Sequence, residues 1–236
     1  MSRFAYHLPI LGYHRVGSLR TDHVPTVSAA AFERQLAFLA RRRYRVLTFH
    51  EVVQLLDRGE PMPRHSTVIT FDDGYEETYT VAWPLLKRFN FPATVFVTPA
   101  EVGTPGFVSW EQVSELSRNG VTIGSHTMHH SYIPLVSDER LPEELVESKH
   151  IIEQHIGCPV HFISYPIGGF TPHAQTIVMQ AGYLAACTTN RAFSRSSMDR
   201  YALRRVKVTE RDVHPLLFFA KVSGYYDLFR QLKAPS

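Results

Sequence analysis

Two short segments of this 236-residue chain carry side chains that could bind a divalent metal. The first holds two adjacent carboxylates, Asp72 and Asp73, and the second holds His126 and His130. One carboxylate and two imidazoles form a three-ligand set with open coordination positions, which suits zinc and also iron, cobalt or nickel. The second carboxylate would then lie beside the metal, where it could act as a base.

Each segment alone is a weak signal. An Asp-Asp-Gly sequence is also a common turn, and a chain with 13 His contains such pairs by chance. Their placement adds weight, because the preceding apolar runs 67–71 and 121–124 resemble buried parallel strands and each is followed by a helical pattern. Both segments should therefore lie at the carboxyl ends of strands, where α/β barrels build their active sites.

Strand-like and helix-like segments alternate along the whole chain, which predicts a parallel sheet with helical crossovers. The predicted strands cover residues 9–13, 45–48, 67–71, 93–97, 121–124, 162–165, 183–188 and 203–208. The predicted helices cover residues 29–43, 51–58, 78–89, 110–119, 139–156 and 172–181, the fourth of them starting from a capping box at Ser109.

The motifs resemble those of a known family. Residues 70–75, Thr-Phe-Asp-Asp-Gly-Tyr, are similar to the first motif of the polysaccharide deacetylases, carbohydrate esterase family 4, also called the NodB-homology domain. His126-Thr-Met-His-His130 matches the second motif, and residues 164–168 resemble the third with two departures. Residues 11–16 and 203–208 resemble the start and end of family members, so the ordered combination is far more specific than any single piece.

This resemblance implies a distorted (β/α) barrel of about seven parallel strands, similar to a TIM barrel, as one catalytic domain over residues 1–236. It assigns Asp73, His126 and His130 as metal ligands and Asp72 as general base. The implied cofactor is one divalent metal, with zinc favoured and cobalt, nickel or iron as alternatives. The implied reaction removes N-acetyl groups from an amino sugar in a polysaccharide, oligosaccharide or glycan precursor, by attack of a water molecule that the metal activates.

The third motif and the end of the chain depart from the family pattern. Ser164 stands where the family has the Arg that orients the base, and Ile167 replaces a Tyr. The resemblance places an oxyanion donor at the backbone N–H of Ile167, with Tyr165 and Pro166 on the substrate-binding side of the same turn. The late Leu-x-x-His motif that carries the general acid is missing, and His14, at the end of the first predicted strand, is our candidate for that role.

Other residues of interest have more ordinary interpretations. His129 cannot share the i, i+4 spacing of the ligand pair, so we expect a surface or supporting residue. Trp110 is interpreted as a packing residue more readily than as a platform for a sugar ring. His214 is a weaker candidate acid than His14, and the polar loop 189–199 is expected at the substrate rim.

Composition bounds the partners. The net charge of +3 comes from 25 basic and 22 acidic residues, and the run Arg41-Arg42-Arg43 ends a predicted helix, which favours a solvated helix end over a nucleic-acid site. Two cysteines suggest no disulfide framework. We find no signal-peptide pattern at the start and no run that approaches the roughly 18 apolar residues of a membrane span. We therefore expect a cytoplasmic protein, and the family resemblance implies an N-acetylated saccharide as its partner.

Two other functions compete with the deacetylase. One keeps the metal chemistry but acts on a non-sugar amide or a cyclic imide. The other is a carbohydrate-binding protein that has lost turnover, which the missing Arg and the missing late His would explain. Retention of Asp72 beside a complete ligand set favours an enzyme, because binding alone does not need a base.

Overall fold

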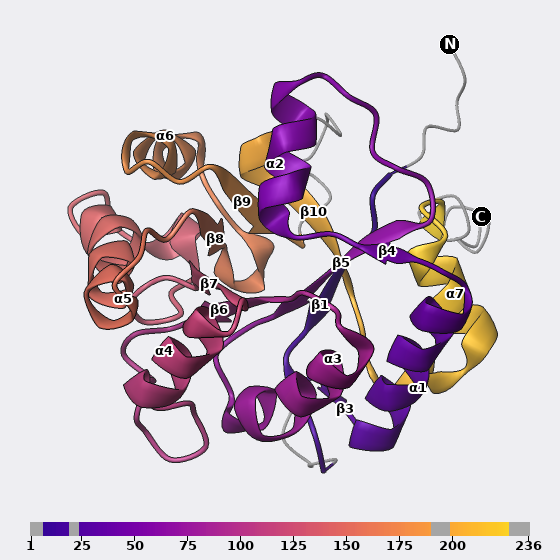
Figure 1. Cartoon of the computed structure of the whole chain (residues 1–236). Coiled ribbons are helices and arrows are strands. Elements are labelled where there is room, and N and C mark those ends of the chain that lie inside the picture. The colour runs from indigo at the N-terminus through magenta and orange to yellow at the C-terminus, as the bar shows by residue number, and fades with distance from the viewer. Residues whose placement is uncertain (1–6, 19–23, 190–198, 227–236) are drawn as a thin grey trace, which may run out of the picture.

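Seven parallel strands close into a barrel (Figure 1), which confirms the predicted fold class. The computed structural model describes residues 7–18, 24–189 and 199–226. The barrel strands are β1 (Ile10–Tyr13), β5 (Ser66–Phe71), β6 (Thr94–Val97), β7 (Thr122–Ser125), β8 (Phe162–Ser164), β9 (Ala185–Thr188) and β10 (Leu203–Lys207). They pair in the order β1-β10-β9-β8-β7-β6-β5, and β1 pairs with β5 to close the ring. Three shorter strands, β4 (Arg45–Val46), β2 (Arg15–Val16) and β3 (Thr26–Val27), add one pairing to β5 and a small two-stranded sheet.

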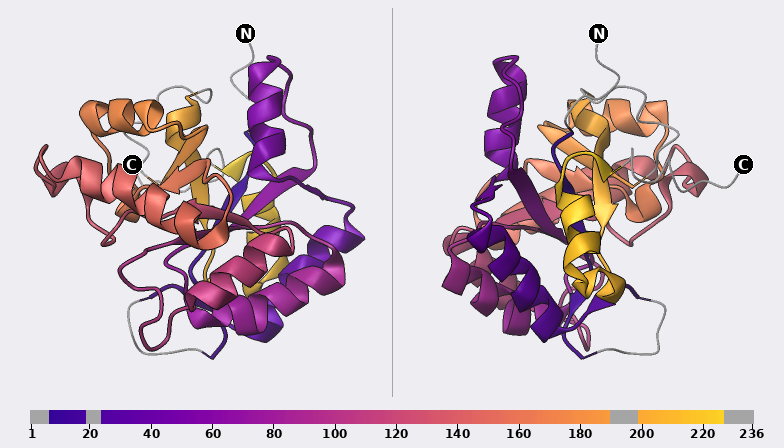
Figure 2. Two further views of the ribbon diagram at one scale, coloured as in Figure 1. Left: turned by 60° about the vertical axis from the view of Figure 1, so that its left-hand side comes forward. Right: turned by 90° about the vertical axis from the view of Figure 1, so that its right-hand side faces the viewer.

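Helices surround the strands on the outside (Figures 1 and 2). The α-helices are α1 (Ala29–Arg41), α2 (Phe49–Asp57), α3 (Trp83–Phe89), α4 (Trp110–Arg118), α5 (Ser148–Ile156), α6 (Pro172–Gln180) and α7 (Pro215–Val222). Single π-helical turns (Thr78–Ala82 and Glu143–Glu147) and short 3-10 turns (Ile133–Leu135, Pro166–Gly168, Arg200–Ala202 and Glu210–Val213) complete the crossovers. Within the described ranges, no helix has the length and apolar character needed to cross a membrane.

Local side-chain chemistry sets the helix boundaries. The capping box at Ser109 is present, with its side chain accepting from the Gln112 N–H, as predicted. The predicted start of α2 at Glu51 is wrong, because Thr48 caps the helix and Glu51 is the third residue of its capping box. The predicted helix 139–156 contains a π-helical turn before α5 begins at Ser148.

A hydrophobic cluster fills the inside of the barrel. Its residues come from six of the strands and contact one another in one cluster, so their side chains must point into the barrel. Three residues of α2 join them. The cluster includes Ile10, Val68, Phe96, Phe162, Cys187, Leu203, Phe49, Val52 and Val53. Gly124 on β7 makes room for this packing, since a Cβ there would lie 2.6 Å from the Phe96 ring. Because α2 precedes β5 in the chain, it closes the amino-terminal end of the barrel and leaves the carboxyl end for a site.

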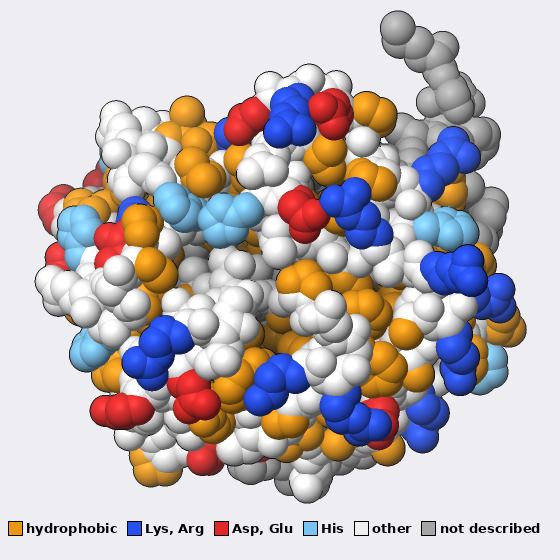
Figure 3. Space-filling model, viewed as in Figure 1, with side chains coloured by type: hydrophobic (Ala, Val, Ile, Leu, Met, Phe, Trp, Pro, Cys, Tyr) orange, Lys and Arg blue, Asp and Glu red, His pale blue; other side chains and the backbone are white. Residues whose placement is uncertain are grey.

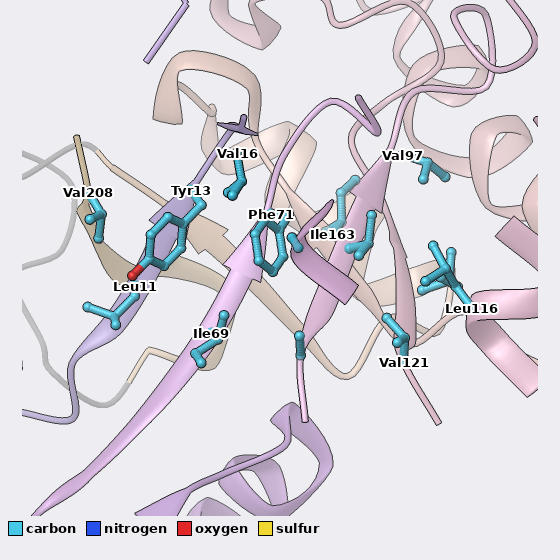
Figure 4. Close-up of a cluster of buried hydrophobic side chains, with 14 of the residues drawn as sticks. Leu11, Tyr13, Val16, Ile69, Phe71, Val97, Leu116, Val121, Ile163 and Val208 are labelled. Carbon is cyan, nitrogen blue, oxygen red and sulfur yellow. The ribbon is translucent and has the colours of Figure 1, made fainter. Parts of the chain in front are cut away.

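A second cluster lies between the strands and the outer helices (Figure 4). Tyr13 and Phe71, neighbours on β1 and β5, stack with ring centroids 5.5 Å apart, and Phe32 of α1 meets Tyr13 edge-on at 5.2 Å. This packing fixes the ends of β1 and β5, which lead directly into His14 and Asp72.

Candidate active site

The structure brings the three predicted metal ligands together. Oδ1 of Asp73, after β5, lies 3.3 Å from Nε2 of His126 and 3.3 Å from Nε2 of His130, both after β7. The three ligand atoms all lie within 4.8 Å of one another. Burial alone would raise the pKa of Asp73, but the contacts with the two imidazoles outweigh it and hold that pKa far below its usual value. The carboxylate is therefore ionised.

The donor set suits a cation. His126 Nδ1 donates to the backbone carbonyl of Ser164 at 2.6 Å, so its Nε2 presents a lone pair toward Asp73. Asp73 Oδ1 is buried and accepts no hydrogen bond of good geometry. Two facing acceptors repel each other unless a proton or a metal ion lies between them, and atoms that bind zinc at about 2.1 Å are separated by about 3.0–3.4 Å. The residues present thus fit a divalent metal.

Backbone strain is concentrated at this site. Only seven described non-glycine residues have positive φ, and four of them are Asp73 (71°), Thr127 (65°), His130 (56°) and Ile167 (59°). Such conformations cost of order 1–3 kcal/mol each and persist where the surroundings enforce them. The strained residues therefore cluster at the candidate site, where their unusual backbone conformations orient the ligand side chains.

Asp72 is held by a buried arginine. Arg205 on β10 donates to both carboxylate oxygens of Asp72, at 2.7 and 2.6 Å, and the two side chains are 2% and 3% exposed. Burial by itself would raise the pKa of Asp72, but the charge and hydrogen bonds of Arg205 lower it overall, with help from His126 and His14. A buried carboxylate that stays ionised can accept a proton.

Arg205 supplies Asp72 with a cation, which the third motif of this chain does not carry. Its Nη2 also donates to the Ser164 hydroxyl at 2.8 Å, and its Nη1 donates to the Thr70 hydroxyl at 3.1 Å. The arginine and the serine therefore meet inside the barrel although they belong to different strands. Sequence reasoning missed Arg205, because alternation along β10 left open whether Arg204 or Arg205 faces inward.

His14 lies beside Asp72, as the candidate role requires. Its Nε2 is 3.9 Å from Asp72 Oδ2, its side chain is 23% exposed, and its Nδ1 has no hydrogen-bond partner among the described residues. Burial lowers the pKa of His14, although Asp72 and Asp73 oppose the shift. This shift favours the neutral form of the imidazole at neutral pH.

The third motif forms a tight turn after β8. Ile167 has a left-handed backbone and an exposed side chain, and within the described residues its N–H has no acceptor. Pro166 is buried and fixes the start of the turn. Tyr165 corrects our expectation: its ring is only 1% exposed and stacks on Phe170 at 4.9 Å, so it supports the turn from the core and does not reach substrate.

A buried carboxylate that the sequence did not suggest holds the second motif. Glu144, fully buried, accepts from the backbone N–H of His129 at 3.0 Å, from the His129 ring at 3.0 Å and from the Ser131 hydroxyl at 2.7 Å. Its own carbonyl accepts from the Met128 N–H at 3.1 Å. His129 is thus a supporting residue, as expected, of the loop 126–131 that carries both His ligands, hereafter the ligand loop. Glu144 holds this loop before and after His129.

The remaining predicted residues have other surroundings or fall outside the described residues. Trp110 stacks on His155 at 3.9 Å with nearly parallel rings, which agrees with a packing role. His214 is exposed at the start of α7. The polar loop predicted at the rim falls mainly on residues 190–198, which lie outside the described residues.

Fold and site together define a class: a (β/α) barrel with a candidate metal centre and a charged carboxylate beside it. The chain belongs to the polysaccharide deacetylase family, whose model, described as polysaccharide deacetylase, matches residues 59–186. It is 30% identical over 202 residues to the putative polysaccharide deacetylase YxkH of Bacillus subtilis, covering 86% of this chain and 71% of that relative. The resemblance seen in the motifs is therefore confirmed.

Other relatives have more specific names. A poly-beta-1,6-N-acetyl-D-glucosamine N-deacetylase of Escherichia coli is 29% identical over 139 residues, which are 52% of this chain and 21% of the relative. The Staphylococcus aureus protein of that name is 26% identical over 171 residues, which are 66% of this chain and 59% of the relative. The chain thus spans less than two thirds of either protein.

Solved structures share the fold. IcaB from Ammonifex degensii superposes with a TM-score of 0.78 at 27% identity, covering 92% of this chain and 98% of that one. The Streptococcus pyogenes deacetylase PplD, solved in complex with acetate, superposes with a TM-score of 0.80 at 24% identity and covers 91% of this chain and 98% of that one.

Proposed function

We propose that the protein is a metal-dependent hydrolase that removes N-acetyl groups from N-acetylglucosamine units of a polysaccharide or oligosaccharide. The observation that carries this proposal is the convergence of Asp73, His126 and His130 within 4.8 Å at the barrel's carboxyl end, beside an ionised Asp72. Relatives named as poly-beta-1,6-N-acetyl-D-glucosamine N-deacetylases support the choice of substrate.

The chain's own residues would divide the work as follows. A divalent metal, zinc by preference, supplies polarisation of the amide carbonyl and makes water easier to deprotonate. Asp72, kept ionised by Arg205, takes the proton of the attacking water. The free N–H of Ile167 is available to donate to the oxygen on which negative charge develops.

The departing amine needs a proton, and His14 is the residue placed to supply it. Its imidazole lies 3.9 Å from Asp72, so an approach of about 1 Å to hydrogen-bond distance would let the proton collected by the carboxylate pass to His14 and then to the leaving nitrogen. This relay would replace the late His that the family pattern supplies from another part of the chain.

The structure weakens the case for a binding protein without turnover. That alternative rested partly on the missing Arg of the third motif, and Arg205 now provides a cation on the base. A hydrolase of small amides or cyclic imides remains the competing enzyme, because its chemistry would use the same residues.

Acetate release from oligomers of β-1,6-linked N-acetylglucosamine, chitooligosaccharides, small acetamides and cyclic imides would test the proposal. We expect release from a saccharide, loss after chelation and recovery with zinc, cobalt, nickel or iron. Asp73→Ala, His126→Ala and His130→Ala should each lose the metal, whereas Asp72→Asn should keep it and turn over about 10²–10⁴-fold more slowly. Full metal content in the three ligand variants, or hydrolysis of the small amides alone, would overturn the proposal.

A further inference from the structure

Helix α7 is apolar on two faces, and the described residues cover only one of them. Phe218 and Val222 are 1% exposed and join the core under the helix. On the opposite side Leu216, Leu217 and Phe219 are 71%, 45% and 47% exposed. A helix that is hydrophobic on all sides is normally buried on all sides. The outer face of α7 is exposed instead, and it has no partner within the described chain.

These side chains form a concentrated patch. The described residues include seven exposed large hydrophobic side chains, and three of them lie within four consecutive positions of α7. Phe38 of α1 extends the patch, because its ring lies 6.5 Å from that of Phe219 and 5.6 Å from that of Phe218. The right-hand view of Figure 2 shows α1 and α7 side by side on this flank.

Arginines border the patch. The guanidinium of Arg42 lies 5.8 Å from the centroid of the Phe38 ring, and its neighbours Arg41 and Arg43 are also exposed. Arg64 is exposed next to His65, whose ring stacks at 5.4 Å on Tyr44 at the end of the same run. Figure 3 shows Lys and Arg side chains gathered at the right-hand edge, where α1 and α7 lie, with hydrophobic side chains between them.

Carboxylates do not neutralise this rim. Within the described ranges, none of Arg41, Arg42, Arg43 and Arg64 forms an ion pair. The carboxylates of α1 and of the segment before α7 are engaged elsewhere: Glu33 with Arg88 at 3.0 Å, Glu210 with Ser28, and the buried Asp212 with Lys221. The flank therefore combines exposed apolar side chains with unpaired positive charge.

We propose that this flank, formed by Leu216, Leu217 and Phe219 with the arginine run 41–43, docks the protein on an anionic lipid bilayer. Apolar side chains beside Arg are the combination that binds in the plane of a membrane interface, the apolar groups entering the headgroup boundary and the cations meeting acidic headgroups. A second copy of the chain fits less well, because a two-fold contact would bring identical arginine rims together. This inference is independent of the proposed catalytic function.

Vesicle co-sedimentation of the full chain would test the proposal, with vesicles of phosphatidylcholine alone and of phosphatidylcholine mixed with phosphatidylglycerol. We expect binding to the mixed vesicles that weakens as salt is raised. Each Arg near an anionic surface strengthens binding about fivefold, so replacing Arg41, Arg42 and Arg43 together by Gln should weaken it about 100-fold. Leu216→Glu combined with Phe219→Glu should weaken it at least about tenfold.

Met179→Glu is the matched control, because Met179 is an exposed apolar side chain, 51% accessible, on the separate helix α6. It should bind vesicles like the wild type, and all variants should keep the wild-type melting temperature and acetate release from a soluble oligomer. Absence of wild-type binding to mixed vesicles, or equal loss in Met179→Glu, would overturn the proposal. A wild-type dimer that Leu216→Glu converts to monomers, without vesicle binding, would show that the flank joins two copies instead.

Discussion

Replacing Arg205 by Gln should impair both the stability of this protein and Asp72, its proposed catalytic base. The change removes two charge-assisted hydrogen bonds of 2.7 and 2.6 Å and leaves the carboxylate of Asp72 buried without its cation. Breaking such a buried pair costs about 3–5 kcal/mol. In a domain of this size each kcal/mol lowers the melting temperature by about 2–4 °C, so we expect a decrease of about 6–20 °C.

The sign of the pH effect follows from the same contact. Burial raises the pKa of Asp72 and Arg205 lowers it, so the pKa must rise when the arginine is removed. The base acts in its ionised form, and the acid limb of kcat/KM for acetate release should therefore move to higher pH. Because the folded-state pKa is depressed in the wild type, its stability advantage is complete above the unfolded-state pKa and is lost as the pH falls through the folded-state pKa.

Two further variants make the test decisive. Lys207→Gln removes an exposed charge from the same strand and should leave the melting temperature and the pH profile unchanged. Arg205→Lys keeps the charge but not the paired geometry, so its acid limb should lie between those of the wild type and Arg205→Gln. A folded Arg205→Gln protein with full metal content and an unmoved acid limb would refute the reasoning.

Three other outcomes are expected. Glu144→Gln should weaken metal affinity about 10–100-fold in a metal titration, because the ligand loop loses its anchor, whereas the exposed neighbour Glu143→Gln should not; equal affinities would remove that role. His14→Ala should lower kcat strongly on an acetamide but little on an activated aryl acetate, whose leaving group needs no proton, and equal losses would indicate positioning instead. Gly124→Ala should cost about 1–3 kcal/mol in chemical denaturation, since its Cβ would lie 2.6 Å from an aromatic ring, whereas Gly12→Ala meets only contacts of 3.7 Å or more and should be tolerated.

The sequence was sufficient to predict the barrel and to single out the three side chains that the structure brings together. Local signals, namely apolar runs of strand length and polar residues placed where those runs end, predicted a parallel sheet and the position of these side chains. The resemblance to the deacetylase family added the barrel and the ligand assignment. Asp73, His126 and His130 follow the carboxyl ends of β5 and β7. The closed barrel brings these strand ends together, and the exact bounds of the outer helices do not affect this.

Arg205, Glu144 and Tyr165 could not be placed in this way. Arg205 and Arg204 are adjacent on a strand, and only the register of β10 in the closed barrel shows which of them points inward. Glu144 reaches the ligand loop from a π-helical turn, which no spacing in the sequence indicates. Tyr165 belongs to a motif that does contact the site, but its own side chain turns toward Phe170 in the core.

The meeting of Arg205 with Ser164 inside the barrel has a consequence for how such proteins evolve. Side chains from different strands that point into one layer of a closed barrel share a single space, so a charge lost from β8 can be regained from β10 without moving the carboxylate that it serves. In a sequence alignment, the column of the third motif shows only that the arginine is missing from β8. The cation beside Asp72 is therefore better compared among relatives by its layer in the barrel than by its position in the sequence. Relatives that lack the arginine of the third motif should be inspected for a cation on β10 before they are counted as inactive.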